Sequence, residues 1–240
     1  MTTDDYLKIR KLLNSSNEIN YQLGLEILQS LNIISSSVRE FILKPRNKFY
    51  SYLKNDDNKD LSINLKNGKV AIELNLSGKN LTEFPKGLEL IEGLISLKFS
   101  HNEIKGIPKK IKYLKNLERL DFSYNKNIGS VDLYHLTQLR HLRVLNIENC
   151  NLKDFPMCFK KSESLSVLYI GRNKISRIPP SISSLKNLTY IDLSNNRIGS
   201  IPKSLFELEY LNFLNLASNQ LPISEKQKME KYLNQINIQF

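Results

Sequence analysis

Cysteine and tryptophan are scarce in this chain of 240 residues, which has two cysteines, Cys150 and Cys158, and no tryptophan. A small secreted domain held together by disulfides carries more cysteines than this. No apolar run approaches the ~18 residues of a transmembrane segment, and the N-terminal MTTDDYLKIRKLL has no apolar stretch typical of a secretory signal. We therefore expect a cytoplasmic protein under reducing conditions, although export without such a signal stays open.

The motifs of the common enzyme classes are also missing. The chain contains no GxxxxGK[ST], GxGxxG, HExxH or GxSxG motif and no paired CxxC. Its three histidines, His101, His135 and His141, do not have the spacing of metal ligands. The sequence thus predicts a non-catalytic protein, with no catalytic residues, no metal site and no cofactor.

Acidic residues are outnumbered, and the formal net charge is +11. A basic protein can bind nucleic acid or an anionic membrane. The excess comes from 26 lysines against 9 arginines spread along the chain, whereas nucleic-acid recognition favours arginine. Clusters such as Lys109, Lys110, Lys112 and Lys115 fit a solvated face. Binding to nucleic acid or anionic membrane remains the alternative to a protein partner.

A repeated segment fills most of the chain. Segments such as LISLKFSHNEI (94–104), LSVLYIGRNKI (165–175) and LTYIDLSNNRI (188–198) share the template L-x-x-L-x-L-x-x-N-x-L. Seven copies begin at residues 71, 94, 117, 142, 165, 188 and 211. The spacing is 23 residues throughout, except for 25 between the third and fourth copies.

This template resembles the leucine-rich-repeat family, and the 23-residue length with a following Ile-Pro or Phe-Pro resembles its intracellular Ras-group and bacterial subclass. The resemblance covers residues 71 to about 223. It implies an α/β fold, a curved solenoid with a parallel β-sheet on its concave face. It also implies that a protein partner docks on that sheet.

Each template position has a physical reading. The L-x-L alternation predicts a short strand whose leucines point into the solenoid. The asparagine both donates and accepts hydrogen bonds, so a stacked ladder of asparagines can satisfy the turn backbone. The predicted ladder is Asn102, Asn125, Asn173, Asn196 and Asn219, with Lys79 and Cys150 in the same slot of the first and fourth repeats. We read Cys150 as structural.

The segment after each template predicts a short helix or 3₁₀ turn on the outer side, introduced by proline. The third repeat lacks the proline and is longer. It predicts a bulge at Lys126–Asn127, with Ile128 in the apolar slot, and a longer outer helix near residues 133–139. The extra residues are either a binding insertion or a neutral loop.

The two ends do not match the template. Residues 1–60 predict a helical N-terminal segment, either a pure cap or a small interaction domain, with capping-box signatures at Ser15 and Ser37. The solenoid spans 61–223, opening with a β-hairpin cap around Asn67-Gly68. Residues 224–240 predict a C-terminal cap: a helix with a Ser224–Gln227 capping box, then a final strand INIQF.

The variable strand positions predict the binding site. Apolar and aromatic residues gather in the C-terminal half of the concave face, with arginines beside them, a composition enriched at interfaces. The competing explanation is that such residues simply suit strands. We expect the protein to be a monomer. Its predicted partner-binding residues are Arg119, Arg143, Val144, Val167, Tyr169, Arg172, Tyr190 and Phe213.

Overall fold

The computed structural model describes residues 61–66, 69–85, 88–91, 93–128, 132–156, 159, 162–232 and 236–240. The predicted helical segment at 1–60 and Cys158 lie outside the described residues. The domain boundaries remain predictions.

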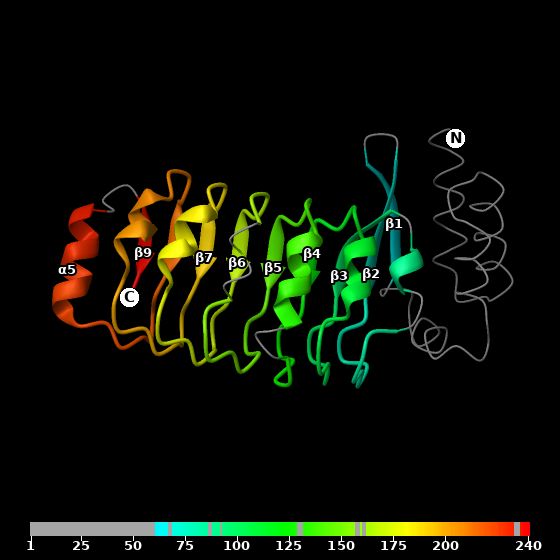
Figure 1. Ribbon diagram of the computed structural model, residues 1–240, viewed down its shortest axis with the longest axis horizontal. Helices are drawn as coiled ribbons and strands as arrows, with labels where there is room; N and C mark the ends of the chain where they lie inside the picture. Colours follow the sequence, from blue (N-terminus) through cyan, green and yellow to red (C-terminus); the bar gives the residue numbers. More distant parts are fainter. Residues whose placement is uncertain are drawn as a thin grey trace, which may run out of the picture.

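One sheet of nine strands in sequence order, β1 to β9, runs the length of the described chain (Figure 1). Its first pair is antiparallel and every later pair is parallel, which gives an open, curled sheet of eight parallel strands. The strands are β1 Leu61–Lys66, β2 Lys69–Asn75, β3 Leu94–Lys98, β4 Arg119–Asp121, β5 Val144–Asn146, β6 Val167–Tyr169, β7 Tyr190–Asp192, β8 Phe213–Asn215 and β9 Asn237–Gln239. The solenoid predicted from the repeats is confirmed.

The antiparallel pair is the hairpin expected at Asn67-Gly68. Strand β1 pairs with β2 from Leu61 opposite Leu74 to Lys66 opposite Lys69, so two residues connect the strands. Since β2 is also the first parallel strand, β1 covers the edge that the sheet would otherwise expose.

The register reproduces the sequence spacing. Arg119 pairs with Ser96, 23 residues earlier in the chain, and with Val144, 25 residues later. From β5 to β8 the partners are again 23 residues apart. The same template position therefore recurs at the same height on neighbouring strands.

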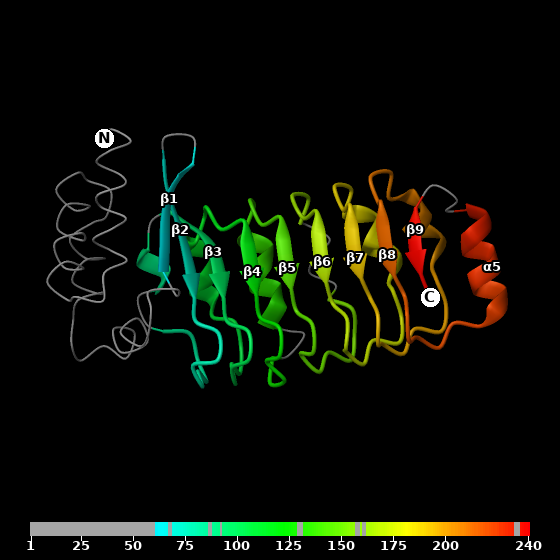
Figure 2. The same ribbon diagram turned by 180° about the vertical axis from the view of Figure 1, so that it is seen from behind.

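Short 3₁₀ segments on one face of the sheet connect the strands, as Figure 1 shows from their side and Figure 2 from the side of the strands. Prolines 108, 179 and 202 are extended and precede three of them, each of which buries one apolar residue. The segments are η1 Leu88–Leu90, η2 Lys109–Tyr113, η3 Asp132–Gln138, η5 Pro180–Ser184 and η6 Lys203–Glu207.

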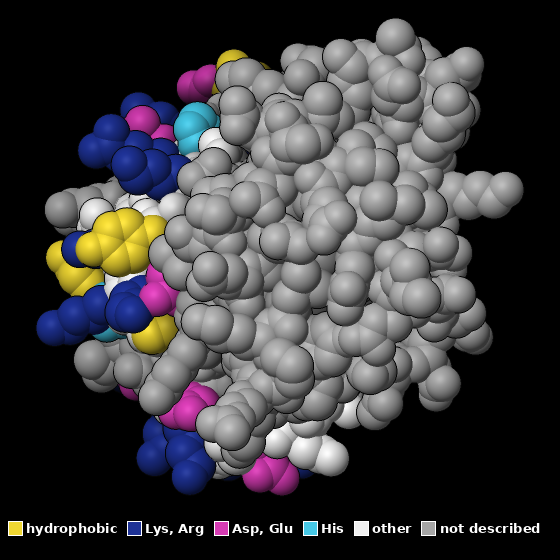
Figure 3. All heavy atoms as spheres, turned by 90° about the vertical axis from the view of Figure 1, so that its right-hand side faces the viewer, with side chains coloured by type: hydrophobic (Ala, Val, Ile, Leu, Met, Phe, Trp, Pro, Cys, Tyr) yellow, Lys and Arg dark blue, Asp and Glu magenta, His cyan; other side chains and the backbone are white. Residues whose placement is uncertain are grey.

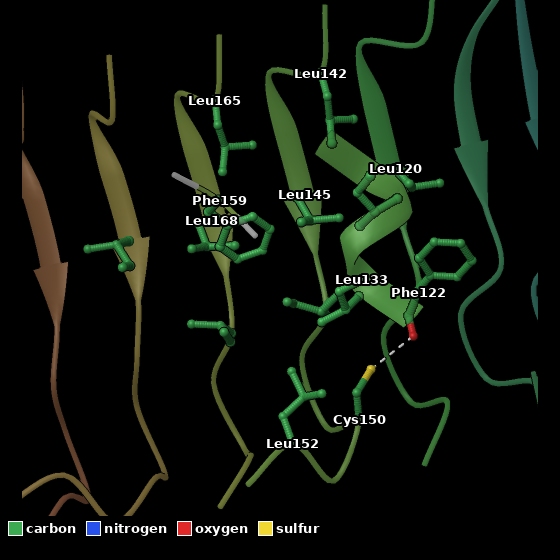
Figure 4. Close-up of a cluster of buried hydrophobic side chains, with 14 of the residues drawn as sticks. Leu120, Phe122, Leu133, Leu142, Leu145, Cys150, Leu152, Phe159, Leu165 and Leu168 are labelled. Carbon is green, nitrogen blue, oxygen red and sulfur yellow. Dashed lines mark hydrogen bonds between the residues drawn. The ribbon is translucent and has the colours of Figure 1, made fainter. Parts of the chain in front are cut away.

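The core lies between the sheet and these segments. Strand leucines such as Leu145 and Leu168 are fully buried, and Leu133 of η3 packs opposite them (Figure 4). Burying such a side chain contributes roughly 1.5–3 kcal/mol. Further toward β2, the stacked rings of Phe99 and Phe122 lie 5.6 Å apart between centroids.

The asparagine ladder forms as predicted. Asn125 donates from Nδ2 to the carbonyls of Phe99 (2.8 Å) and Phe122 (2.9 Å), and its Oδ1 accepts from the Ile104 N–H (2.9 Å). Asn102, Asn173, Asn196 and Asn219 repeat this arrangement. Each side chain thus joins its own turn to the preceding repeat.

The two slots without asparagine have a different backbone. The residue after the slot, Asn80 in the first repeat and Asn151 in the fourth, has a positive φ of 54° and 59°. Asparagine tolerates this conformation better than most residues. In both places the next ladder asparagine accepts two backbone N–H groups, as Asn173 does from Cys150 and Leu152 (both 3.0 Å).

The third repeat departs from the others where the sequence predicted. Lys126 and Asn127 are exposed in a turn, and Ile128 is buried in the apolar slot. Segment η3 has seven residues, against five in η2, η5 and η6. The two extra residues are therefore accommodated outside the core.

The predicted capping box of the C-terminal helix is wrong. Helix α5, Ile223–Tyr232, begins directly after Pro222, so Ser224 is its second residue and not its N-cap. The Pro222 carbonyl accepts from the N–H groups of Glu225 (3.0 Å) and Lys226 (3.2 Å) and starts the helix instead. Met229 is fully buried, and β9 pairs with β8 as the expected final strand.

Candidate functional site

Two columns of side chains face outward from the strands. Strand register places Arg119, Val144, Val167, Tyr190 and Phe213 side by side, one per strand from β4 to β8. Tyr169 lies in the second column, between Asn146 and Asp192. These residues are therefore neighbours on the outward face of the strands.

The aromatic row, which consists of Tyr169, Tyr190 and Phe213, is packed side chain against side chain. The rings of Tyr190 and Phe213 are stacked with centroids 4.6 Å apart, and those of Tyr169 and Tyr190 are 5.1 Å apart and tilted. All three residues are half-buried, as are Val144 and Val167. Because the rings cover one another, the row is a preformed surface and not a set of separate exposed side chains.

Tyr190 keeps its proton throughout the physiological range. Partial burial, then the nearby carboxylate of Asp192 and then Tyr169 raise the pKa of its phenol. Its hydroxyl can therefore donate a hydrogen bond to a ligand while the ring offers apolar contact.

The arginines predicted for the site do not form one cluster. Arg119 is adjacent to Val144 in the register and pairs with Glu73 two strands away, Nη2 to Oε1 2.6 Å. This ion pair spans the small Ser96, which is buried although its position faces outward. Both partners are substantially exposed, so the pair contributes little stability.

Arg143 and Arg172 lie at opposite ends of the strands. Arg143 precedes β5, whereas Arg172 follows β6 in the turn and pairs with Glu148, Nε to Oε1 2.9 Å. They therefore lie beside the apolar residues at different strand ends, and their part in binding stays a prediction.

A third column, toward the turns, has a feature that the sequence analysis missed. Every member has a positive φ: Gly78, His101, Tyr124, Asn149, Arg172, Asn195 and Ser218. The glycine and the two asparagines were the available signal, because these residues favour that conformation. His101 and Tyr124 stack here, with ring centroids 4.2 Å apart.

The outer face carries exposed lysines and the most exposed aromatics of the described residues. Figure 3 shows Lys, Arg and hydrophobic side chains along its left edge, which corresponds to the front of Figure 1. Tyr113, Tyr134 and Tyr210 are more than half exposed there, but they belong to separate 3₁₀ segments or connections. Lys110 pairs with Glu89 (2.7 Å).

The described residues contain no group of three or more His, Cys, Asp or Glu side chains that could hold a metal ion. Cys150 is fully buried, and burial raises the pKa of its thiol to about 12. A protonated, inaccessible thiol cannot act as a nucleophile, which supports the structural reading of this cysteine. In the part of the chain that the structure describes, no helix is long and apolar enough to cross a membrane.

Family models for leucine-rich repeats match residues 113–136, 141–162 and 163–221. No curated protein sequence matches the chain.

Solved structures with the same fold include bacterial repeat proteins. A leucine-rich-repeat protein of Leptospira interrogans is 28% identical over 67% of this chain and 41% of its own, with a TM-score of 0.63. The internalin InlF of Listeria monocytogenes is 26% identical over 63% of this chain and 42% of its own, with a TM-score of 0.55. Internalin C2 of the same species, 21% identical over 70% and 78% with a TM-score of 0.53, shows the fold alone.

The chain thus spans less than half the length of the first two proteins. The three family models, the phased repeats and the nine-stranded sheet agree with one another. The chain belongs to the leucine-rich-repeat family.

Proposed function

We propose that this chain is a non-catalytic scaffold that binds a protein partner on its concave face, centred on the aromatic row. The leucine-rich-repeat fold supports a protein-interaction scaffold in general. The observation that carries the proposal is the packed row of Tyr169, Tyr190 and Phe213.

A partner that binds the aromatic row has few side chains left to order. Half-buried rings on paired strands lose little conformational entropy when a partner covers them, since their neighbours already restrict them. Aromatic residues and arginine dominate the energetics of many interfaces. Val144 and Val167 extend the apolar surface beside the row, and Arg119 supplies a charged margin.

The test compares two matched tyrosine pairs. We expect Tyr169→Ala with Tyr190→Ala to weaken binding to a partner captured from the native host by at least about tenfold, because loss of an interface centre costs ~2 kcal/mol or more. Tyr113→Ala with Tyr210→Ala, on the outer face, should leave the affinity unchanged. The measurement is titration calorimetry with the purified partner.

The two pairs of tyrosine variants also distinguish between possible binding sites. Equal affinity of the concave variant and the wild type would place the partner elsewhere on the solenoid. Saturable binding of duplex DNA or anionic vesicles at low salt, with no protein captured, would favour the alternative of an electrostatic surface.

A further inference from the structure

A polar hollow of ≈ 510 Å³ lies at the turn edge of the solenoid, away from the aromatic row. Its lining spans the third to the sixth repeat and includes Lys126, Asn149, Asn151, Arg172, Lys174 and Arg197. A hollow of this size can take several residues of an extended chain or a small ligand.

Both irregular and repeated features of the fold build this hollow. The longer third repeat carries Lys126 outward in its turn. Asn149 and Asn151, on either side of Cys150, both have positive φ, as does Arg172. Asn173 and Asn196 also line it, but backbone groups of their own and the preceding repeats already bind their amides. They fix the shape and leave recognition to the other residues.

The charge of the lining has one sign. Four cationic residues line the hollow and no carboxylate does. Glu148 balances Arg172 from outside the lining. Within the described part of the chain, the side chains of Lys126, Lys174 and Arg197 make no hydrogen bond or ion pair, and all three are exposed. The hollow therefore offers unused donors and uncompensated positive charge.

We infer that this hollow binds an acidic peptide segment, rich in Asp or Glu, of a protein partner. The guanidinium of Arg197 can take a carboxylate through two parallel hydrogen bonds, and the lysines add charge. The amides of Asn149 and Asn151 can both donate and accept, which matches the N–H and C=O groups of a peptide backbone. A phosphate or sulfate group offers acceptors only and would leave the asparagine carbonyl oxygens without a donor, so the asparagines favour a peptide.

This inference deepens the proposed function, since it assumes a protein ligand, but it uses different residues. The turn edge continues from the strand that carries Tyr169, because Arg172 follows it by three residues. A partner seated on the aromatic row could place an acidic segment in the hollow.

The probe for the test is a fluorescein-labelled peptide of ten residues in which Asp and Glu alternate with Gly and Ser. Its control replaces Asp and Glu by Asn and Gln. By fluorescence anisotropy in 50 mM NaCl, we expect saturable binding of the acidic peptide, at least about tenfold tighter than the control, weakening in 300 mM NaCl.

The variants locate the binding. Lys174→Gln with Arg197→Gln should weaken binding of the acidic peptide about tenfold or more. Lys109→Gln with Arg140→Gln removes the same charge from exposed positions outside the hollow and should change it by less than about twofold. Circular dichroism checks that each variant is folded.

Three results would overturn the inference. They are an absence of saturable binding in 50 mM NaCl, equal loss in both charge variants, and tighter binding of a ten-nucleotide single-stranded DNA than of the acidic peptide. The Tyr169→Ala with Tyr190→Ala variant should bind the acidic peptide normally. Failure of the hollow is thus distinguishable from failure of the aromatic row.

Discussion

Asn125 and Cys150 occupy the same slot of neighbouring repeats but satisfy the turn differently. Asn125 donates to two carbonyls at 2.9 Å or less and accepts from a backbone N–H. Cys150 offers one S–H, 3.2 Å from the Phe122 carbonyl (Figure 4), and no oxygen acceptor. A thiol is a weak donor but costs little to bury, so the slot is held mainly by packing.

The buried thiol of Cys150 predicts a pH dependence of stability. Burial raises its pKa from 9.0 to about 12, so the folded state keeps the proton that the unfolded state loses. The contribution is fully present below pH 9 and is lost progressively as pH rises from 9 toward 12. Urea unfolding should show a fall of up to roughly 1.4 kcal/mol per pH unit in the difference between wild type and Cys150→Ala.

The control is chemical. Iodoacetamide at pH 8 should leave Cys150 unlabelled in the folded protein and label it in urea, with peptide mass spectrometry assigning the site. A pH-independent difference in stability, or rapid labelling of the folded chain, would contradict the raised pKa.

At the scale of the element, the third and fourth repeats both depart from the repeat template, the third by its extra residues and the fourth by Cys150 in place of asparagine. In a regular repeat, the ladder asparagine accepts a backbone N–H from the preceding repeat. The donor lies two residues after the ladder position of that preceding repeat, as Ile104 lies two residues after Asn102 and donates to Asn125. Cys150 has no oxygen acceptor, and the N–H of Ile128 bonds instead to the carbonyl of Asn125 in its own turn (3.3 Å). The extra residue in this turn makes that local bond possible, so the insertion compensates for the missing asparagine.

A double-mutant cycle tests this coupling. Cys150→Asn alone should destabilise the protein by about 1–3 kcal/mol, because its buried amide oxygen finds no donor. Deletion of Asn127 alone should also destabilise it, since the N–H of Ile128 then faces a thiol. The double variant restores the repeat template. We therefore expect its loss of unfolding free energy to be smaller, by at least about 1 kcal/mol, than the sum of the losses in the two single variants.

The cycle is measured by urea unfolding monitored by circular dichroism. Cys150→Ala, which adds no amide, combined with the same deletion should show no such recovery. Strict additivity in the asparagine cycle would mean that the two repeats deviate independently.

At the scale of the whole molecule, stability depends on closing a sheet that has two ends. A solenoid contacts only its neighbours, so an uncapped terminal repeat exposes core and strand edge. Strand β1 covers the first parallel strand, and β9 covers β8 through bonds from the Leu216 N–H to Gln239 (2.7 Å) and from the Asn237 N–H to Asn212 (3.0 Å). Helix α5 buries Met229 against the last repeat.

Removal of residues 236–240 should therefore expose the edge of β8. We expect this truncation to self-associate through the free edge, detected as a higher mass by size-exclusion chromatography with light scattering. Replacing Asn237 with Pro, which removes the N–H that bonds to the Asn212 carbonyl but keeps the length, should give the same shift. A truncated chain with the same mass as the wild type at high concentration would contradict a capping role for β9.

Local periodicity made most of the fold predictable. The L-x-L alternation, the asparagines and the prolines specify a strand, a turn and an outer segment in every repeat, and seven phased copies leave one way to stack them. The hairpin at Asn67-Gly68, Ile128 as the substitute in the third repeat and the final strand followed from the same local signals. The start of α5 did not, because a backbone carbonyl took the role assigned to a side chain.

The sequence by itself determined which residues share a column on the concave face, since register follows from the repeat length. Only the tertiary structure decided what those columns do. It packed Tyr169, Tyr190 and Phe213 into one row and gathered four cations around the hollow at the turn edge. Distances across repeats depend on backbone turns and ring packing, which residue spacing does not encode.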